Sequence, residues 1–321
     1  MNSKPSTTYL SNQSIPRLET AFLALGLILS TFRLEAKDPG LPSTVAAGAT
    51  LTEVYSDPRF FEGPTWDPKT KKLYFTAFPK DQKNTEILRL DAPGRVTVWA
   101  DNTEGVNGTF LSHNGRLLAA QAFGHRVLKY SFGKKGPGNT QVVLYDSTLN
   151  QPNDICEAPN GNLYFTDPDF KNRRTSAVFL LRPKGELIKL ITEMPLPNGI
   201  KTSNDGKTLY VGDSHEKLWR AYPIMPNGIT GPGRVFFNPE TESKADPDGF
   251  SIDEHGNLYL SGRGGVWVVN PEGEALGMIP VKEFVSNATF GDVDGKALYL
   301  TCDGKVYRLA MTVRGAQFTR P

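Results

Sequence analysis

Short apolar segments alternate with polar turns along most of the chain, and the same pattern returns every 39 to 50 residues. Six segments share it, and they begin at Glu62, Asn107, Asn153, Asn198, Asp248 and Asn287. These starting residues are 45, 46, 45, 50 and 39 residues apart. A repeat of this length is typical of the four-stranded blade of a β-propeller.

Each segment has the same internal order of residue types. A polar residue opens it, a short apolar strand follows, and a turn such as Asn160-Gly161 leads into a second strand such as residues 163–165. Asn-Gly and Asp-Gly between apolar runs are strong hairpin signals. No helical period of useful length occurs outside the N-terminal region. An open β-solenoid or a row of hairpins would share this pattern, but closure protects the sheet edges.

The pattern therefore predicts an all-β protein, a six-bladed β-propeller in a single domain over residues 37–321. A ring of blades needs a closing contact. We expect the strand-like run at residues 51–55 to complete the last blade.

One position of the repeat indicates a site. In a propeller the first strand of each blade lines the central channel, so the opening residues of the six segments should form one ring at its mouth. All six are carboxylates or carboxamides, and such oxygen atoms suit hard cations. Asn and Asp also open strands simply by bonding to turns, but Glu is a poor turn former. Glu62 therefore favours a single divalent-metal site over the alternative.

Loops between second and third strands should lie on the same face as this ring. They contain Gln121, His125, Asp167, Asp169 and Asp213. A histidine in such a loop is placed for acid–base work because it titrates near neutral pH. A purely structural role for His125 is the alternative.

The first 36 residues differ from the rest. Lys4 and Arg17 supply positive charge, an apolar run covers residues 21–29, and Ala36 is a small residue before Lys37. This order is typical of a secretory signal peptide, with an uncleaved anchor as the alternative. The run is shorter than the roughly 20 residues of a membrane span. We expect a mature protein that begins near Lys37, is periplasmic or secreted, and has no stable membrane insertion.

Composition narrows the partners. Lys and Arg number 36 against 34 Asp and Glu, a net charge of +2, and the basic residues are scattered. Nucleic-acid binding needs a clustered basic face, so we expect none. Cys156 and Cys302 are too few for a disulfide framework and are predicted to be buried thiols. Nothing in the sequence indicates the oligomeric state.

Four motifs in order carry a family resemblance: Glu62-Gly63-Pro64, Pro152-Asn153-Asp154, Pro197-Asn198-Gly199 and Pro247-Asp248-Gly249. They resemble the gluconolactonase and regucalcin (senescence marker protein) family, and the bacterial gluconolactonase-like members most. The resemblance covers the chain from about residue 50 to about residue 312.

The resemblance implies one bound divalent cation, Ca²⁺ first, with Zn²⁺, Mn²⁺ or Mg²⁺ as alternatives. By motif match, Glu62, Asn198 and Asp248 would be ligands, and Asn153 a ligand or substrate contact. Asp248 would be the general base. Some members carry an arginine where this chain has Gln151, so their substrate preference does not carry over.

The function predicted first is metal-dependent hydrolysis of a sugar lactone. The metal would polarise the ring carbonyl, and a carboxylate would activate water. The expected substrate contacts are Asn107, Asn153, Gln121, Gln151 and His125. Two alternatives stay open: another esterase, such as an organophosphate hydrolase, on the same site, and a non-catalytic binding propeller whose metal only joins the blades.

Overall fold

The computed structural model describes residues 40–319, except residues 240, 242, 244 and 263. The predicted signal segment, 1–36, lies outside the described residues. The described part is built from strands, and a 3-10 helix, η1 (Ala316–Phe318), lies near its end. Within it, no helix has the length and apolar character needed to cross a membrane.

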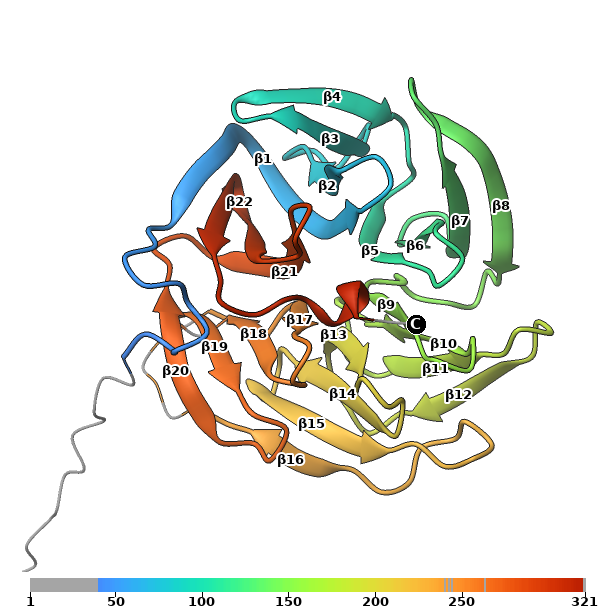
Figure 1. The fold of residues 1–321 in the computed structure, drawn as a ribbon. Helices are drawn as coiled ribbons and strands as arrows, with labels where there is room; N and C mark the ends of the chain where they lie inside the picture. The colour runs from blue at the N-terminus through green and yellow to red at the C-terminus, as the bar shows by residue number, and fades with distance from the viewer. Residues whose placement is uncertain (1–39, 240, 242, 244, 263, 320–321) are drawn as a thin grey trace, which may run out of the picture. The chain divides into compact units, whose positions relative to one another are not determined.

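Five sheets stand around a common centre in the described part of the chain (Figure 1). Four of them have four strands each. The first two of these comprise β5 (Val106–Leu111), β6 (Leu117–Gln121), β7 (Arg126–Phe132) and β8 (Pro137–Tyr145), and β9 (Ile155–Glu157), β10 (Leu163–Asp167), β11 (Ala177–Leu181) and β12 (Leu187–Ile191). The other two comprise β13 (Pro197–Thr202), β14 (Thr208–Asp213), β15 (Leu218–Pro223) and β16 (Arg234–Phe237), and β17 (Phe250–Ile252), β18 (Leu258–Gly262), β19 (Gly265–Val269) and β20 (Ala275–Pro280).

The fifth sheet has six strands and corrects the prediction of six blades. Its order is β21 (Val285–Gly291), β22 (Ala297–Ala310), β1 (Thr52–Asp67), β2 (Lys72–Phe78), β3 (Glu86–Ala92) and β4 (Arg95–Ala100). The first half of β1 pairs with β22, and its second half pairs with β2. The first and last repeats are therefore joined into one sheet, and the sheets number five rather than six.

This same strand confirms how the ring closes. Thr52 pairs with Arg308 and Glu53 with Tyr307, so the N-terminal run completes the sheet of the last repeat, as predicted. The register shifts between Ser56 and Phe60, where β1 passes from one partner to the other. A strand shared in this way leaves no free edge at the junction.

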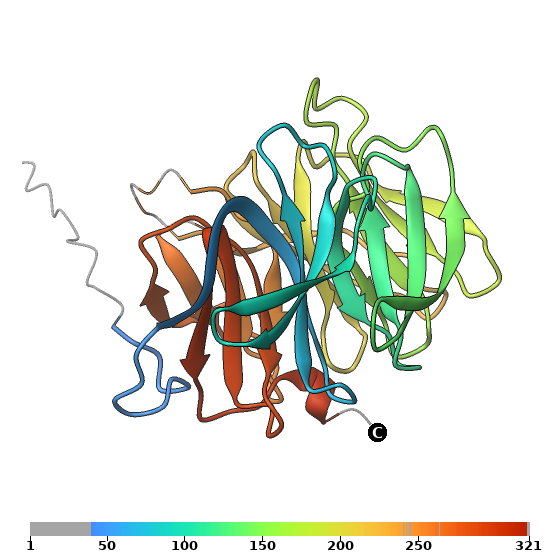
Figure 2. The same ribbon diagram turned by 90° about the horizontal axis from the view of Figure 1, so that it is seen from above.

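The first strand of each repeat faces the centre. Neighbouring first strands contact one another in a closed series from β1 through β5, β9, β13, β17 and β21 back to β1. Figure 2 shows the strands from the side, with η1 at one end of the ring. The six opening residues are consequently brought to one central place.

Apolar side chains fill the space between adjacent sheets. Tyr164 and Leu180 of one sheet pack with Ile200 and Val211 of the next. Cys156 and Cys302 are both buried, as predicted, and belong to different apolar clusters. This packing holds the first strands in fixed positions around the centre.

Candidate active site

The predicted ring exists at the centre of the described sheets. Glu62 lies in β1, Asn107 in β5, Asn198 in β13 and Asn287 in β21, while Asn153 and Asp248 come just before β9 and β17. All are buried except Asn107, which is partly exposed. Each sits at the point where its strand begins to run along the centre.

Hydrogen bonds show which members of the ring meet. The Asn287 amide nitrogen lies 3.1 Å from Glu62 Oε2 and 3.3 Å from both oxygens of Asp154. One amide therefore donates to two carboxylates from different repeats. Glu62 also accepts a bond from the backbone N–H of Gly63.

Asp154 is a member of this centre that the sequence prediction missed. It is fully enclosed beside Asn153, and its carboxylate faces the centre with Glu62 and Asp248. The signal was present in the repeat, because the other five segments carry Gly63, Gly108, Gly199, Gly249 and Ala288 at the equivalent position. Asp154 is therefore the one carboxylate at a repeat position that otherwise holds glycine or alanine.

The small residues are required by close approach of the first strands. The N–H of Gly108 donates to the carbonyl of Asn153 over 2.7 Å. A Cβ at Gly108 would overlap Asp154 Oδ1 and the Asn153 carbonyl oxygen. The Asp154 carboxylate therefore occupies space that a side chain at residue 108 would fill.

Burial makes ionisation of the three carboxyl groups costly, and the charge of Asp154 adds to the cost at Glu62 and Asp248. Burial raises the pKa of Glu62 well above its usual range, and the charges of Asp154 and Asp248 add to the effect. Burial, followed by the charge of Asp154, also raises the pKa of Asp248 well above its usual range. Burial also raises the pKa of Asp154, opposed by Lys201 and by the bond from Asn287. A positive charge at this centre would lower the pKa of all three carboxyl groups.

The carboxamide oxygen of Asn198 is available to bind a ligand. Its Nδ2 donates to Ser214 Oγ over 3.2 Å, and its side chain bonds Asp248. Ser214 in turn donates to the carbonyl of Pro247 over 2.6 Å. Asn198 Oδ1 is buried and has no hydrogen-bond partner among the described residues, and the same holds for Asn107 Oδ1. Buried acceptors without a partner are rare and require an explanation.

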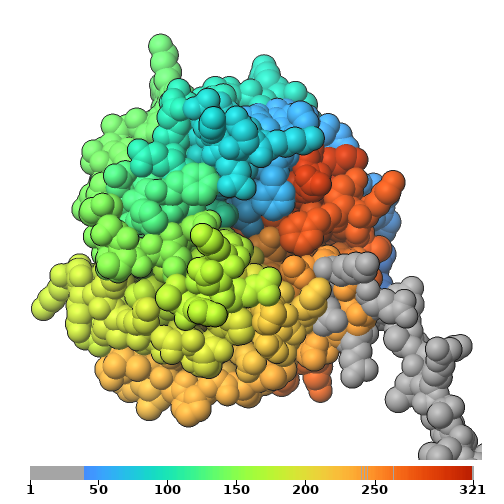
Figure 3. All heavy atoms as spheres, turned by 180° about the vertical axis from the view of Figure 1, so that it is seen from behind, coloured from blue at the N-terminus to red at the C-terminus, as the bar shows by residue number. Residues whose placement is uncertain are grey.

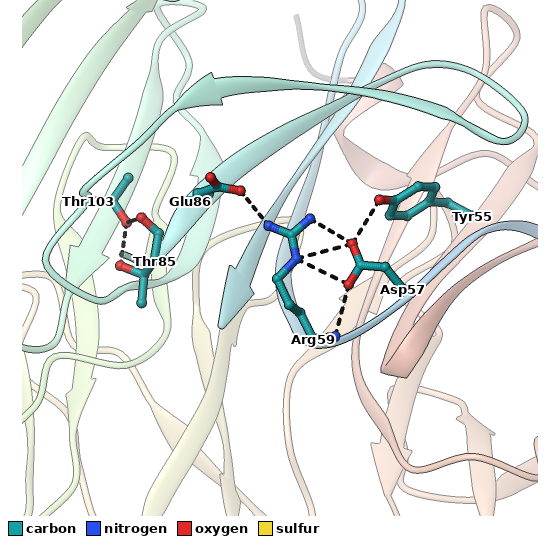
Figure 4. Close-up of polar contacts among 6 residues, drawn as sticks. All are labelled: Tyr55, Asp57, Arg59, Thr85, Glu86 and Thr103. Carbon is teal, nitrogen blue, oxygen red and sulfur yellow. Dashed lines mark hydrogen bonds and ion pairs between the residues drawn. The ribbon is translucent and has the colours of Figure 1, made fainter. Parts of the chain in front are cut away.

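An arginine clamp fixes β1 where it bends towards Glu62 (Figure 4). Arg59 donates through Nη2 to Asp57 Oδ2 over 2.6 Å and through Nη1 to Glu86 of β3. The Tyr55 hydroxyl donates to the same Asp57 oxygen over 2.7 Å. The clamp spans the shift of register in β1, so it sets the direction from which Glu62 enters the centre.

A cavity of about 490 Å³ opens beside the ring. It lies between loops of several repeats, and its lining consists of Pro58, Phe60, Phe78, Pro79, Lys80, Gln82, Asn107, Ala122, Phe123, Gln151, Phe170 and Asp303. Figure 3 shows the face opposite to that of Figure 1, where chain near β10 and β11 rises beside the centre. Two predicted substrate contacts, Asn107 and Gln151, line this cavity.

The other predicted loop residues are engaged elsewhere. Gln121 is buried and its Nε2 donates to the carbonyl of Thr103 over 2.8 Å. His125 has a left-handed backbone with φ of 52°, and neither residue belongs to the lining of the described cavity. Asp167 and Asp213 accept backbone bonds from nearby residues, Asn150 and His215 respectively. These carboxylates shape loops.

The ring and the cavity beside it define a class: an all-β propeller with a polar, carboxylate-bearing centre and a cavity that shares Asn107 with it. The model of the family described as SMP-30/Gluconolactonase/LRE-like region matches residues 60–303. The chain therefore belongs to this family, and the resemblance seen in its motifs is confirmed.

Known relatives span nearly the same length. The chain is 26% identical over 305 residues to a gluconolactonase of Zymomonas mobilis, covering 84% of each chain. It is 27% identical to the solved structure of the Xanthomonas campestris gluconolactonase XC5397, with a TM-score of 0.72, covering 84% of this chain and 92% of that one. A calcium-binding protein, regucalcin, of Agrobacterium tumefaciens shares the fold at 21% identity and a TM-score of 0.65, covering 81% and 96%.

Proposed function

We propose that this protein is a metal-dependent hydrolase that opens the ring of a sugar lactone. The observation that carries the proposal is the buried centre, where Glu62 and Asp154 share the amide of Asn287 and Asp248 is bonded by Asn198, whose buried oxygen has no partner among the described residues. The gluconolactonases among the relatives support the choice of substrate.

The residues at the centre fit a divalent cation. Three buried carboxylates with raised pKa values need a counter-charge, and the buried Oδ1 atom of Asn198 has no partner among the described residues. Among the described residues, no group of three or more His, Cys, Asp or Glu side chains is placed to hold a metal ion. Amide oxygens of asparagine would therefore complete the ligands of the cation. Glu62, Asn198 and Asp248 would hold the cation, with Asn153 beside them. Oxygen ligands of this kind favour Ca²⁺, and the calcium-binding structural relative supports that choice.

When bound, the cation would polarise the lactone carbonyl and stabilise negative charge on its oxygen. Asp248 would take a proton from water as the water oxygen bonds to the carbonyl carbon. The ring C–O bond then breaks, and its oxygen receives the proton from Asp248, which gives a hydroxy acid and restores the carboxylate. Asn198 orients Asp248 through its side-chain bond. Asn107 and Gln151 lie in the cavity, where they would contact the substrate.

The test compares Glu62→Gln with the exposed control Glu272→Gln. Both proteins are freed of metal with a chelator and assayed on glucono-δ-lactone with Ca²⁺, Zn²⁺, Mn²⁺ or Mg²⁺, and cation binding is measured by calorimetry. We expect the wild type and the control to bind a cation and open the lactone, and Glu62→Gln to lose both. Equal cation binding by wild type and Glu62→Gln would show that the centre is not the metal site.

The same experiment separates the alternatives. Binding of a cation without hydrolysis of any lactone or ester would indicate a binding protein in which the metal only joins the repeats. Cleavage of a phosphotriester or an ester with no action on lactones would indicate the other hydrolase chemistry.

We also propose that the protein is exported. The basic residues, the apolar run at 21–29 and Ala36 motivate this proposal. Mass spectrometry of protein from its native host would give the mature start, expected near Lys37. A full-length chain in the cytosolic fraction would contradict the proposal.

A further inference from the structure

The cavity beside the ring has an aromatic wall that the proposed reaction does not require. Phe60 of β1 and Phe78 of β2 are directly paired across the sheet. Phe78 meets Phe123 edge to face, with ring centroids 6.5 Å apart, and Phe60 stacks on Phe284 at 6.3 Å. Phe60, Phe78 and Phe123 are thus joined into one surface of the cavity, and Phe284 packs on Phe60 outside the described lining.

Phe123 is presented to the cavity by a well-bonded loop. Its backbone N–H donates to the carbonyl of Glu104 over 3.1 Å, and that of Ala122 donates to Gly105 over 2.8 Å. The ring nevertheless remains 40% exposed. The hydrogen bonds of this loop therefore place the Phe123 side chain where it is partly exposed to solvent.

Phe170 is held in the same way by the loop between β10 and β11. Asp169 accepts bonds from the backbone N–H groups of Asn172 over 2.9 Å and Arg174 over 3.2 Å, and its own N–H donates to Ser176 Oγ over 2.8 Å. Phe170 stays 44% exposed next to this buried aspartate. An exposed phenyl ring on a hydrogen-bonded loop favours binding of an apolar partner, because little ordering entropy of the loop remains to be lost.

The wall is continuous with the proposed catalytic centre. Phe60 lies two residues before Glu62, and Asn107 belongs to both the ring and the cavity lining. Two of the side chains expected to contact sugar hydroxyls, Gln121 and His125, are not part of that lining. The lining also carries polar side chains, namely Lys80, Gln82, Asn107, Gln151 and Asp303, so the phenyl rings favour only the apolar part of a ligand.

We propose that the cavity also binds lactones carrying an alkyl or aryl substituent, and that these are better substrates than the same rings without the substituent. This inference rests on the proposed lactone hydrolysis. The ring would lie over the polar centre with its substituent against Phe78, Phe123 and Phe170. Water still adds to the carbonyl carbon and the ring C–O bond still breaks, while the substituent takes no part in the chemistry.

The experiment uses δ-valerolactone and δ-decalactone, which share a six-membered ring and differ by a pentyl chain. The measured quantity is the ratio of kcat/KM for δ-decalactone to that for δ-valerolactone, with the cation supplied. We expect a ratio of about 10 or more for the wild type, since apolar pockets discriminate by this order for each well-packed methylene. Phe123→Ala and Phe170→Ala should each lower the ratio by about 3-fold to 10-fold.

Leu276→Ala is the matched control. Leu276 lies on β20, is 40% exposed like Phe123, and is not part of the cavity lining, so its loss should leave the ratio unchanged. A wild-type ratio near one, or ratios unaltered by both phenylalanine variants, would overturn the inference while lactone hydrolysis stands. If no lactone is opened with any cation, the proposed function fails. The inference is then judged by calorimetric binding of δ-decalactone, and binding that is absent or independent of Phe123 and Phe170 overturns it.

Discussion

Asn287 donates a hydrogen bond to Glu62 over 3.1 Å although 225 residues separate them in the sequence. The bond joins the last repeat to the first at the centre of the molecule. The same amide reaches Asp154, so a neutral donor stands between two buried carboxylates. Without it, those two buried carboxylates would lose their shared hydrogen-bond partner.

Asn287→Ala should therefore lower stability and disturb the centre together. Loss of a donor to buried charged groups costs about 1–3 kcal/mol, so we expect a lower unfolding free energy in denaturant and weaker cation binding in calorimetry. Asn270→Ala is the control, because the Asn270 side chain bonds the exposed Glu274 in a surface turn. Equal losses in the two variants would refute a special role for Asn287.

The two proposed ligands Asp248 and Asn198 should differ in a defined order. Asp248→Asn removes a formal charge and the proton acceptor at once, so we expect kcat to fall by about 10²-fold to 10⁴-fold. Asn198→Ala removes one dipole and should weaken cation binding less than Glu62→Gln does. Rates and calorimetric affinities, measured beside the surface control Asp294→Asn, test the order. A more severe loss of cation binding in Asn198→Ala than in Glu62→Gln would contradict it.

Gly108→Ala should destabilise the protein although glycine replacement often has the opposite effect. The new Cβ would overlap Asp154 Oδ1 and the Asn153 carbonyl, and overpacking of this kind costs about 1–3 kcal/mol. Thermal unfolding measures the loss. At Gly138 a Cβ would meet only Ser131, whose side chain can move, so Gly138→Ala should unfold close to the wild type. An unchanged melting temperature for Gly108→Ala would mean that the first strands can separate freely.

Asp167 gives the protein a predictable dependence on pH. Burial raises its pKa from the ordinary 3.8 to about 6, although Asn150 donates to its Oδ2 atom. The folded state therefore holds the proton more tightly than the unfolded state, and stability falls as pH rises from about 4 through 6. The difference between the two pKa values corresponds to about 3 kcal/mol.

Asp167→Asn cannot titrate, so its unfolding free energy relative to the wild type should rise by about 3 kcal/mol between pH 4 and pH 7. Denaturant unfolding at several pH values measures this difference, and the comparison cancels the other titrating groups. A difference that does not change with pH would show that Asp167 ionises freely in the folded protein.

Local patterns predicted the hairpins and the ring well. The turn at Asn160-Gly161 joins two strands because glycine adopts the left-handed conformation found there, with φ of 83°. The opening residues face the centre because every repeat presents its first strand in the same way. Because the repeats are alike, short segments of sequence predicted how residues far apart along the chain are arranged.

Features that depend on one repeat alone were harder to predict. The count of sheets changed because β1 continues between two partners, and Asp57-Pro58 at that passage does not end the strand. Asp154 departs from the repeat and was overlooked for that reason. Gln121 turned inward because Thr103, from a different loop, offers it a carbonyl. The aromatic wall also joins distant segments, which the spacing of phenylalanines along the chain does not show.

The distribution of the centre over the repeats has a consequence for the order of events during synthesis. Glu62 leaves the ribosome early, but Asp248 follows 186 residues later and Asn287 later still. A chain that has folded its first repeats holds Glu62 without the donor that will accompany it, and it has no complete set of cation ligands. The proposed cation could be captured only after the repeat that carries Asp248 has joined those that carry Glu62 and Asn198, so its binding would distinguish such molecules from shorter intermediates.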